Sequence, residues 1–333
     1  MRMILVGYGV VGQNFSKLLS IRKKELISKY GLNPRIIAVV DRQGTIVDHK
    51  GLDPDEILRI KLGKGTIASK GTGKANTFDL IRSLDAEIMV ETTPTDIRTA
   101  EPGLSHIETA IKAKKQVITT NKGPLALALP ALLELARHNK TNLLFSGAVG
   151  GGTPILTFGR KCLSVDKIVA IHGILNGTTN FILTKMENEN MDFRTALKLA
   201  QQMGFAEKNP SLDIDGLDTA CKIVILANWL MRMEVTLKDV NVQGIRRVGK
   251  DEIIKAKNQG FSIKLIGSIN GGLQVKTEMV RKNDPLCVHG NLNAIKFISE
   301  FAGEEVLVGK GAGGLETASA ILRDLLEIRE RIS

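Results

Sequence analysis

The N-terminal segment constrains the fold of this chain more than any other part. An apolar run, Met3–Val6, leads into Gly-Tyr-Gly-Val-Val-Gly at residues 7–12, and a helical pattern follows over Gln13–Lys29. The run predicts a buried strand, and the spaced glycines permit a tight turn, close approach of a ligand and close packing of the helix. The start of the helix supplies N–H donors and a positive dipole end. The pattern predicts a dinucleotide-binding turn, with a purely structural glycine turn as the alternative. Its expected pyrophosphate contacts are Gly7, Gly9, Val10, Val11 and Gly12.

Residues 1–146 alternate short apolar runs with helical patterns. The further expected strands are Arg35–Val40, Glu87–Glu91, Gln116–Thr119 and Leu143–Phe145. The expected helices between them are Pro54–Leu62, Asn76–Leu84, Ile107–Lys115 and Lys122–His138. Alternation of strands and helices indicates βαβ units, and strands without polar alternation are typically covered on both faces. We therefore expect an α/β fold whose first domain, residues 1–146, contains a Rossmann-type parallel sheet.

The pattern changes after a glycine cluster that begins at Gly147. The expected strands are Val165–Ile174, Phe261–Ile269, Leu273–Val280, Ala294–Ile298 and Val306–Val308. The expected helices are Thr179–Glu187, Phe193–Met203 and Leu217–Met231. This mixture predicts a second, α+β domain over residues 147–308, built on antiparallel hairpins. The last helix, Thr317–Ile332, follows another glycine-rich turn, and we expect residues 309–333 to complete the first domain.

Composition narrows the classes of partner. The formal net charge is +11, which suits an anionic ligand, but no run of five basic residues occurs and aromatic residues make up only 4%. A nucleic-acid surface usually concentrates its charge and its stacking side chains. The three cysteines have no metal-type spacing, which indicates a reducing, cytoplasmic setting. The longest apolar stretch, Ile223–Met231, is too short for a membrane span. We expect a small-molecule ligand, no nucleic acid and no membrane.

The end of the second expected strand bears on the choice of dinucleotide. Asp41 and Arg42 follow it directly. An acidic residue at this point binds the adenine-side ribose of NAD, whereas an arginine accepts the 2′-phosphate of NADP. Both residue types are present, so either cofactor remains open. Arg42 and the basic charge balance favour NADP.

The most informative segment of the second half is the apolar helix that begins at Leu217. Asp218 and Lys222 interrupt it at positions i and i+4, so both lie on one face. Charges in an apolar helix are costly unless they are paired or face a polar cavity. One interpretation is a buried structural ion pair. The other is that Lys222 faces a cleft and exchanges a proton with a substrate.

A lysine that works near neutral pH needs a neighbouring cation or desolvation, because its ordinary pKa is near 10.4. Lys122 follows the expected strand Gln116–Thr119. Parallel sheets bind ligands at the carboxyl ends of their strands. Lys122 is therefore the expected second cation.

Several motifs, taken together and in this order, carry a resemblance to a known family. They are GYGVVG, ETTPTD, TTNKGPLA, GAVGGGTPI, GILNGTTNFIL, GFAE, DIDGLDTACK and GKGAGGLETA. Over essentially the whole chain this pattern resembles the homoserine dehydrogenase family. The resemblance implies NAD(P)-dependent interconversion of L-homoserine and L-aspartate 4-semialdehyde, in threonine and methionine biosynthesis. It also implies a homodimer.

The resemblance also implies roles for individual residues. Lys222 matches the lysine that donates a proton to the substrate oxygen, Lys122 the second active-site lysine, and Asp218 the carboxylate that holds both Lys222 and the reacting oxygen. The implied substrate-binding residues are Glu207, Asp213, Gly177 and Thr178. The implied cofactor contacts beyond the glycine turn are Thr92, Thr93, Lys122 and Gly311.

A structural sodium ion is a further implication of the resemblance. Its ligands would be the backbone carbonyls of Val149, Gly151 and Thr153, while Ser146 stands where the family often has a carboxylate. No sequence follows Ser333 for a regulatory ACT domain and no aspartate-kinase segment precedes Met1, so feedback control by threonine through such a domain is not expected.

Two rival functions remain open. A phosphorylating semialdehyde dehydrogenase would need a cysteine nucleophile with a histidine partner. Cys162 and Cys287 lack a context that indicates a nucleophile, and Cys221 is expected to point away from the face of Asp218 and Lys222 and to serve packing. A non-catalytic dinucleotide sensor or nucleic-acid regulator would bind polyanions in a salt-sensitive way and would not turn over homoserine.

Overall fold

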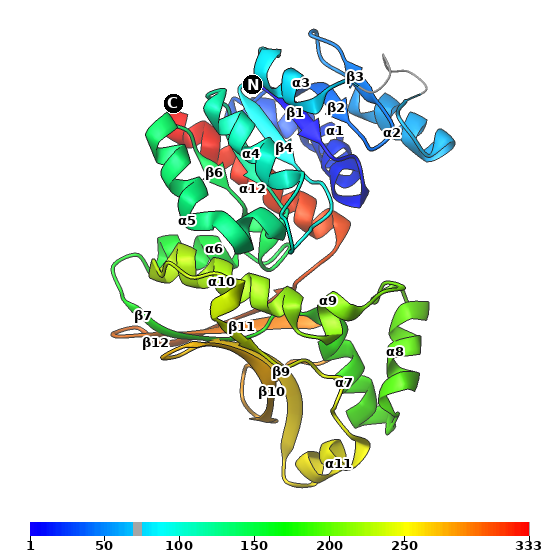
Figure 1. Ribbon diagram of the computed structural model, residues 1–333, viewed down its shortest axis with the longest axis vertical. Helices are drawn as coiled ribbons and strands as arrows, with labels where there is room; N and C mark the ends of the chain where they lie inside the picture. Colours follow the sequence, from blue (N-terminus) through cyan, green and yellow to red (C-terminus); the bar gives the residue numbers. More distant parts are fainter. Residues whose placement is uncertain (69–74, 333) are drawn as a thin grey trace. The chain divides into compact units, whose positions relative to one another are not determined.

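The computed structural model describes residues 1–68 and 75–332 and divides the chain into two compact units. The first unit consists of Met1–Ala148 and Gly313–Ser333, and the second of Val149–Ala312. The sequence pattern predicts changes of domain after residues 146 and 308, whereas the two units of the structure change after Ala148 and Ala312. The first unit is therefore discontinuous in sequence, and the last helix returns to it (Figure 1).

The first unit contains a six-stranded sheet in the order β3-β2-β1-β4-β5-β6. The strands are β1 (Arg2–Val6), β2 (Arg35–Val40), β3 (Thr45–Val47), β4 (Ile88–Glu91), β5 (Gln116–Thr119) and β6 (Leu143–Leu144). β1 pairs in parallel with both β2 and β4, and β4, β5 and β6 continue the parallel arrangement. This confirms the predicted Rossmann-type parallel sheet. The short β3 was not predicted, and it pairs antiparallel to β2 at the edge.

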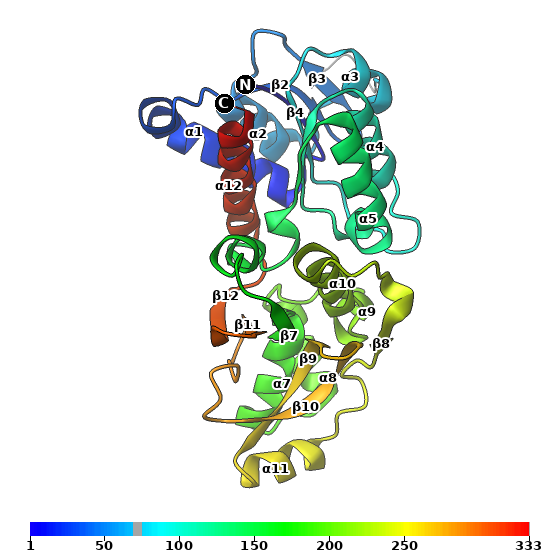
Figure 2. The same cartoon turned by 90° about the vertical axis from the view of Figure 1, so that its left-hand side faces the viewer.

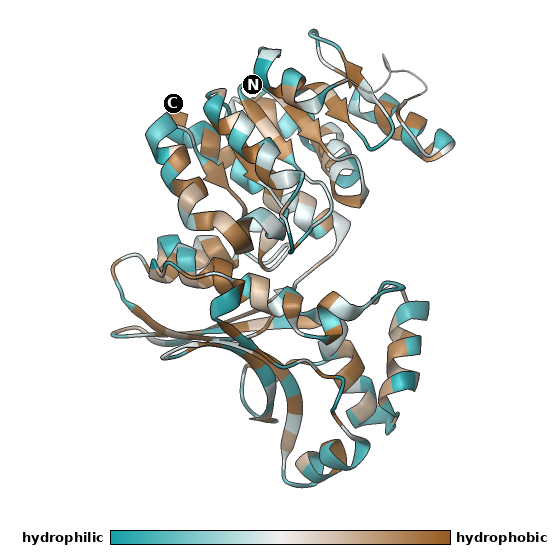
Figure 3. Ribbon diagram, viewed as in Figure 1, coloured by the Kyte–Doolittle hydropathy of each residue, from teal (hydrophilic) through white to brown (hydrophobic). Residues whose placement is uncertain are grey.

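Helices cover both faces of this sheet, which explains why its strands are apolar throughout (Figure 3). They are α1 (Val10–Tyr30), α2 (Pro54–Lys64), α3 (Thr77–Ser83), α4 (Gly103–Lys112), α5 (Lys122–Asn139) and α12 (Gly314–Ile332). α1 and α12 lie on one side of the sheet and α3, α4 and α5 on the other (Figure 2). Met3 and Leu5 of β1 share a core with Phe15 of α1 and Ile321 of α12. The predicted helix Ile107–Lys115 instead begins at Gly103 and ends at Lys112.

The second unit contains a mixed sheet in the order β12-β11-β7-β9-β10-β8. Its strands are β7 (Ile168–Ile174), β8 (Val240–Val242), β9 (Phe261–Ile269), β10 (Leu273–Arg281), β11 (Leu292–Ser299) and β12 (Gly303–Lys310). The pairs β9–β10 and β11–β12 are antiparallel, as expected for hairpins. The predicted start of β7 at Val165 is wrong, because that side chain is 99% exposed and the strand begins at Ile168.

The helices of the second unit are α6 (Ile155–Thr157), α7 (Gly177–Glu189), α8 (Phe193–Gln202), α9 (Ser211–Ile214), α10 (Leu217–Met231) and α11 (Lys250–Asn258). Three of them, α7, α10 and α11, pack against β9, while α8 and α9 pack against α7 and α6 against α10. Phe181 of α7, Ala220 of α10, Leu265 of β9 and Val275 of β10 belong to one buried cluster. α10 is buried continuously over residues 219–228, which is the environment that its apolar sequence predicts. Within the described residues, no helix combines the length and the apolar character that crossing a membrane requires.

Candidate active site

The glycine turn at the start of α1 has the geometry of a phosphate-binding turn. Gly7 has a φ of 95°, and a Cβ there would lie 2.6 Å from the carbonyl carbon of Thr92. A Cβ at Gly12 would lie 2.4 Å from the Gly7 oxygen, so helix and strand pack too closely for a side chain. Nothing lies within 4 Å of the Cβ position of Gly9, which leaves its backbone open to a ligand. Gly9 caps α1 without a side-chain hydrogen bond, and the next residue, Val10, is 68% exposed. The N-terminal N–H groups of α1 thus fit a dinucleotide pyrophosphate.

A buried hydrogen-bond network follows the carboxyl end of β4. Glu91 is fully buried, and its Oε1 accepts hydrogen bonds from both the backbone N (2.6 Å) and the hydroxyl of Thr93. His106 Nδ1 lies 2.8 Å from Glu91 Oε2. Thr92 donates its hydroxyl to the Gly7 carbonyl oxygen at 2.7 Å, which ties β4 to the glycine turn. Sequence reasoning named the two threonines but gave no role to Glu91, the first residue of the ETTPTD motif, or to His106, because only the fold brings these two side chains together.

The same network leads to Lys122. Asn121 caps α5 by accepting the backbone N–H of Gly123, and its Nδ2 donates to Thr93 Oγ1 at 3.2 Å. Lys122 is the first residue of α5 and is half-buried, and its backbone N donates to Thr95 Oγ1 at 3.4 Å. Lys122 belongs to the first unit and Lys222 to the second, so their cooperation stays a prediction.

Asp41 at the end of β2 is held by a lysine that sequence analysis did not single out. Lys61 Nζ of α2 donates to Asp41 Oδ2 at 2.5 Å, and the backbone N of Gln43 donates to Asp41 Oδ1 at 3.1 Å. The Asp41 side chain is 5% exposed, whereas Arg42 is exposed. Both oxygens of Asp41 therefore have protein partners, and two cations stand at this end of the sheet.

In the second unit, α10 places a buried ammonium group beside a carboxylate. Lys222 is 5% exposed, and its Nζ donates to Asp218 Oδ2 at 2.7 Å and to the carbonyl oxygen of Leu175 at 2.5 Å. Leu175 directly follows β7, so the pair lies where β7 meets the start of α7. An ammonium group has three N–H donors, and two of them are accounted for here.

Asn176 joins this pair to Asp213 of α9. Its Nδ2 donates to Asp213 Oδ1 at 2.6 Å and to Asp218 Oδ2 at 2.9 Å. Burial raises the pKa of Asp213, and the nearby negative charge of Asp218 raises it further. Asp215 does not join the cluster, because Arg246 binds both of its oxygens and lowers the pKa of that carboxyl. Sequence reasoning missed Asn176, although its place before α7 was visible as a helix-capping pattern.

The other predicted substrate-binding residues surround the start of α7. Gly177 begins the helix, and Thr178 donates its hydroxyl to the Phe205 carbonyl oxygen at 2.7 Å. Glu207 is exposed, and its backbone carbonyl accepts Gln201 Nε2 at 3.1 Å. Phe205 thus connects Thr178 to the loop that carries Glu207.

The predicted cation ligands lie in a tight turn of the second unit. The backbone N of Thr153 donates to the Gly150 oxygen at 2.8 Å, and the Thr153 oxygen itself accepts the backbone N of Ile155 at 2.8 Å. A Cβ at Gly151 would lie 3.0 Å from the oxygen of Gly311, which in turn packs against the Asn293 amide. Among the described residues, no group of three or more His, Cys, Asp or Glu side chains is placed to hold a metal ion. A sodium ion would depend on backbone carbonyls, one of which already accepts a hydrogen bond.

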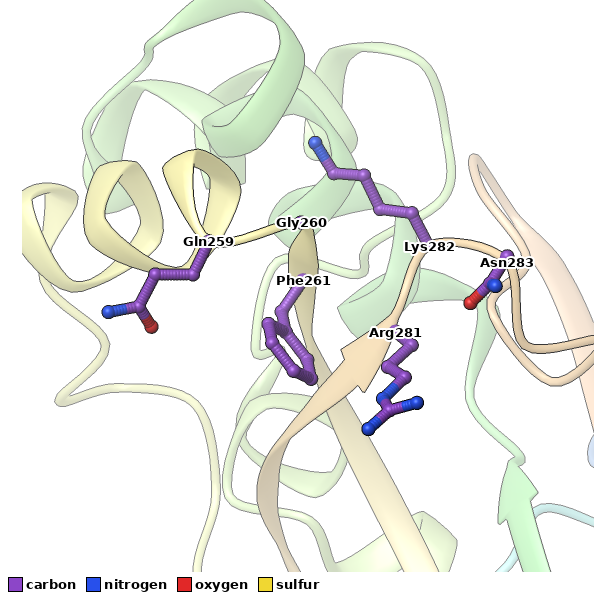
Figure 4. A pocket seen from close by; sticks show the side chains of 6 residues that line it. All are labelled: Gln259, Gly260, Phe261, Arg281, Lys282 and Asn283. Atoms are coloured by element: carbon purple, nitrogen blue, oxygen red, sulfur yellow. The ribbon is translucent and has the colours of Figure 1, made fainter.

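An open depression lies at the end of the β9–β10 hairpin that is nearest to α11 (Figure 4). None of the predicted site residues lines it. The residues that line it are Gln259, Gly260, Phe261, Arg281, Lys282 and Asn283.

Comparisons with known proteins define the class of this chain and then its family. Residues 7–146 match the family model for the homoserine dehydrogenase NAD-binding domain, in agreement with the glycine turn. The chain is therefore an oxidoreductase with a dinucleotide-binding domain. Residues 154–326 match the family model for homoserine dehydrogenase itself. The chain belongs to the homoserine dehydrogenase family.

Individual relatives match over almost their full length. A homoserine dehydrogenase of Methanocaldococcus jannaschii is 44% identical over 98% of both chains. A crystal structure from Archaeoglobus fulgidus has a TM-score of 0.92 and 34% identity, and covers 98% of this chain and 99% of its own. A hyperthermophilic archaeal homoserine dehydrogenase mutant, solved in complex with NADPH, has a TM-score of 0.87 and 26% identity, with 99% and 98% covered. The family match extends across both units of the chain.

Proposed function

We propose that this homoserine dehydrogenase interconverts L-homoserine and L-aspartate 4-semialdehyde with NADP or NAD, in the biosynthesis of threonine and methionine. When bound, the nicotinamide supplies the hydride acceptor or donor. The glycine turn, with its open Gly9 and the free N–H groups of α1, supports binding of the dinucleotide phosphates. Thr92 and Thr93 are the proposed contacts of the nicotinamide end.

Lys222 is the proposed general acid and base, and its buried, doubly anchored ammonium group is the observation that carries the proposal. Leu175 and Asp218 accept two of its N–H groups. The third donor has no partner among the described residues and can bind the oxygen of the substrate. In the direction of reduction, Lys222 Nζ gives a proton to the carbonyl oxygen, and in the direction of oxidation it takes one from the hydroxyl group.

The surrounding residues have supporting roles. Asp218 holds Lys222 and balances its charge, while Asp213 and Glu207 are the proposed partners of the substrate ammonium. Gly177 and Thr178 are proposed to contact the substrate from the start of α7. Lys122 is proposed to favour proton release by adding positive charge. The chain is further proposed to form a homodimer and to bind a sodium ion through the backbone carbonyls of the turn at residues 149–153.

Replacing Lys222 tests the assignment. We expect Lys222→Ala to lower kcat by about 10²- to 10⁴-fold, because positioned general acid–base groups contribute about that much. The dinucleotide affinity should stay nearly unchanged, because the glycine turn belongs to the first unit. The measurement is the absorbance of the reduced nicotinamide with homoserine, for NADP and NAD separately, together with dinucleotide titration of the variant.

Lys198→Ala is the matched control, since Lys198 is an exposed lysine on α8 of the same unit. It should retain full activity. Retained dinucleotide binding and an unchanged circular dichroism spectrum would show that Lys222→Ala is folded. A folded Lys222→Ala enzyme with the kcat of the parent would refute the assignment.

A further inference from the structure

The Asn176 side chain uses all of its hydrogen-bonding groups at the centre of the candidate site. It is 5% exposed. Its Oδ1 accepts the backbone N–H of Thr179 at 2.9 Å, which caps α7. Its Nδ2 has two protons and two acceptors, Asp213 Oδ1 at 2.6 Å and Asp218 Oδ2 at 2.9 Å. The helix cap therefore fixes the orientation of the amide and directs its donors towards the two carboxylates.

These carboxylates need a donor between them. Asp213 is buried close enough to Asp218 for the negative charge of Asp218 to raise the pKa of Asp213. Two like charges in a buried site disfavour ionisation of one of them. The groups that face Asp213 are Asp218 and Lys222 from α10, and Asn176 and Thr178 from the start of α7. Hydrogen bonds to the ionised form favour it.

We propose that Asn176 is a positioning residue for the dehydrogenase reaction: its amide keeps Asp213 and Asp218 ionised and apart, and through Asp218 it orients Lys222 towards the substrate oxygen. This inference rests on the proposed role of Lys222.

A purely structural role would be the capping of α7 alone. Serine and aspartate cap helices about as well as asparagine. Asn176→Ser and Asn176→Asp therefore preserve the cap but change the bridge. Serine removes the two-proton donor, and aspartate places a third carboxylate between the other two. If Asn176 only caps α7, the kcat/KM of either variant should differ little from that of the parent.

The experiment compares both variants with Asp192→Ser, which alters the cap of α8 elsewhere in the same unit. For Asn176→Ser we expect kcat/KM for homoserine to fall about 10- to 100-fold, the range that corresponds to loss of a hydrogen bond to a charged group. The kcat/KM of Asn176→Asp for homoserine should fall by at least the same factor. The KM for the dinucleotide should stay near that of the parent, because the glycine turn belongs to the first unit. Asp192→Ser should keep the parent kcat/KM.

The pH dependence of kcat/KM is a further measurement, and a role limited to capping α7 would leave it unchanged. Loss of the donor makes the carboxylates easier to protonate, so the acid limb of kcat/KM should move to higher pH in Asn176→Ser. If both variants keep the parent kcat/KM and acid limb, the proposal is wrong. If Asn176→Ser does not fold, the proposal is tested by kcat/KM and its acid limb in the isosteric Asn176→Asp variant.

A double-mutant cycle separates this inference from the role of Lys222. If Asn176 acts through Lys222, Asn176→Ser should add little to the loss already caused by Lys222→Ala. An equal loss in both backgrounds would overturn the positioning role and leave the assignment of Lys222 intact. Full activity of Lys222→Ala would instead overturn the proposed function itself.

Discussion

At the scale of single residues, the partners of Asp41 affect the choice of dinucleotide. A carboxylate has about four acceptor positions, and Lys61 Nζ and the backbone N of Gln43 each occupy one of those of Asp41. Lys61 also offsets the charge that would repel a 2′-phosphate. Arg42 is exposed next to this pair. The arrangement supports the preference for NADP that the sequence suggested.

Replacement of Arg42 tests that preference. We expect Arg42→Ala to weaken NADP binding about tenfold or more, because a charge-assisted hydrogen bond contributes about 1.5–3 kcal/mol. Binding of NAD, which lacks the 2′-phosphate, should change little. Calorimetric titration of both dinucleotides gives the two dissociation constants.

Lys64→Ala provides the control, since Lys64 is an exposed lysine at the end of α2. An unchanged NADP affinity in Arg42→Ala would remove Arg42 from the phosphate site.

At this scale, whether a contact between two residues could be predicted from the sequence depended on how far apart the two residues are in the chain. The Asp218–Lys222 pair was predictable because its members are one helical turn apart in an apolar helix. Asn176 is 42 residues from Asp218, and Lys61 is 20 residues from Asp41, so only the fold brings each pair together. Glu91 and His106 were missed for the same reason, because they meet across 15 residues of chain.

At the scale of elements, predictions held where the strand or helix has a continuous apolar run and failed for two strands that lack one. The parallel strands and α10 have continuous apolar runs, and these determined their burial. β3 and β8 are three residues each and depend on pairing with neighbouring strands, which a local pattern does not contain. α5 continues past Pro130, although the backbone of Ala128 is not helical. Local propensity predicted the element but not this kink.

The contact between α12 and the end of β6 contains a buried acid. Asp324 of α12 is 1% exposed, and its Oδ2 accepts the backbone N of Ser146 at 2.9 Å. Burial raises the pKa of Asp324 to about 7. The folded chain therefore keeps this proton up to about pH 7, whereas the unfolded chain releases it at the ordinary pKa of an aspartate.

Asp324 should make the stability of the first unit depend on pH. Between about pH 4 and pH 7 the folded state binds the extra proton, so the free energy of unfolding should fall as pH rises, by about 1.4 kcal/mol per pH unit from this group. Asp324→Asn remains uncharged and should flatten the dependence in that window. Urea unfolding at a series of pH values measures it.

Glu330→Gln serves as the matched variant, because Glu330 is an exposed acid on the same helix. It should retain the slope of the parent. A parent slope that persists in Asp324→Asn would show that other groups cause it.

At the scale of the whole molecule, the chain is organised as one unit inserted into another. The core of the first unit includes α12, which follows the second unit in sequence, and the second unit has a separate buried cluster. The glycine turn belongs to the first unit, whereas the Lys222 cluster belongs to the second. A glycine-rich stretch lies at each point where the chain passes from one unit to the other, at residues 147–152 and at residues 311–314.

The inserted arrangement predicts which unfolding transition the dinucleotide affects. Leu325 of α12 and Leu265 of β9 are both buried core leucines, one in each unit. Each replacement by alanine should destabilise its own unit by about 2–5 kcal/mol. NADP at 100 times its dissociation constant should stabilise the unit that binds it by about 2.7 kcal/mol. In scanning calorimetry, Leu325→Ala should therefore lower the temperature of the unfolding transition that NADP shifts upward. Leu265→Ala should lower the temperature of the transition that belongs to the second unit. If Leu325→Ala lowered only the temperature of the transition that NADP does not affect, α12 would not support the dinucleotide-binding unit.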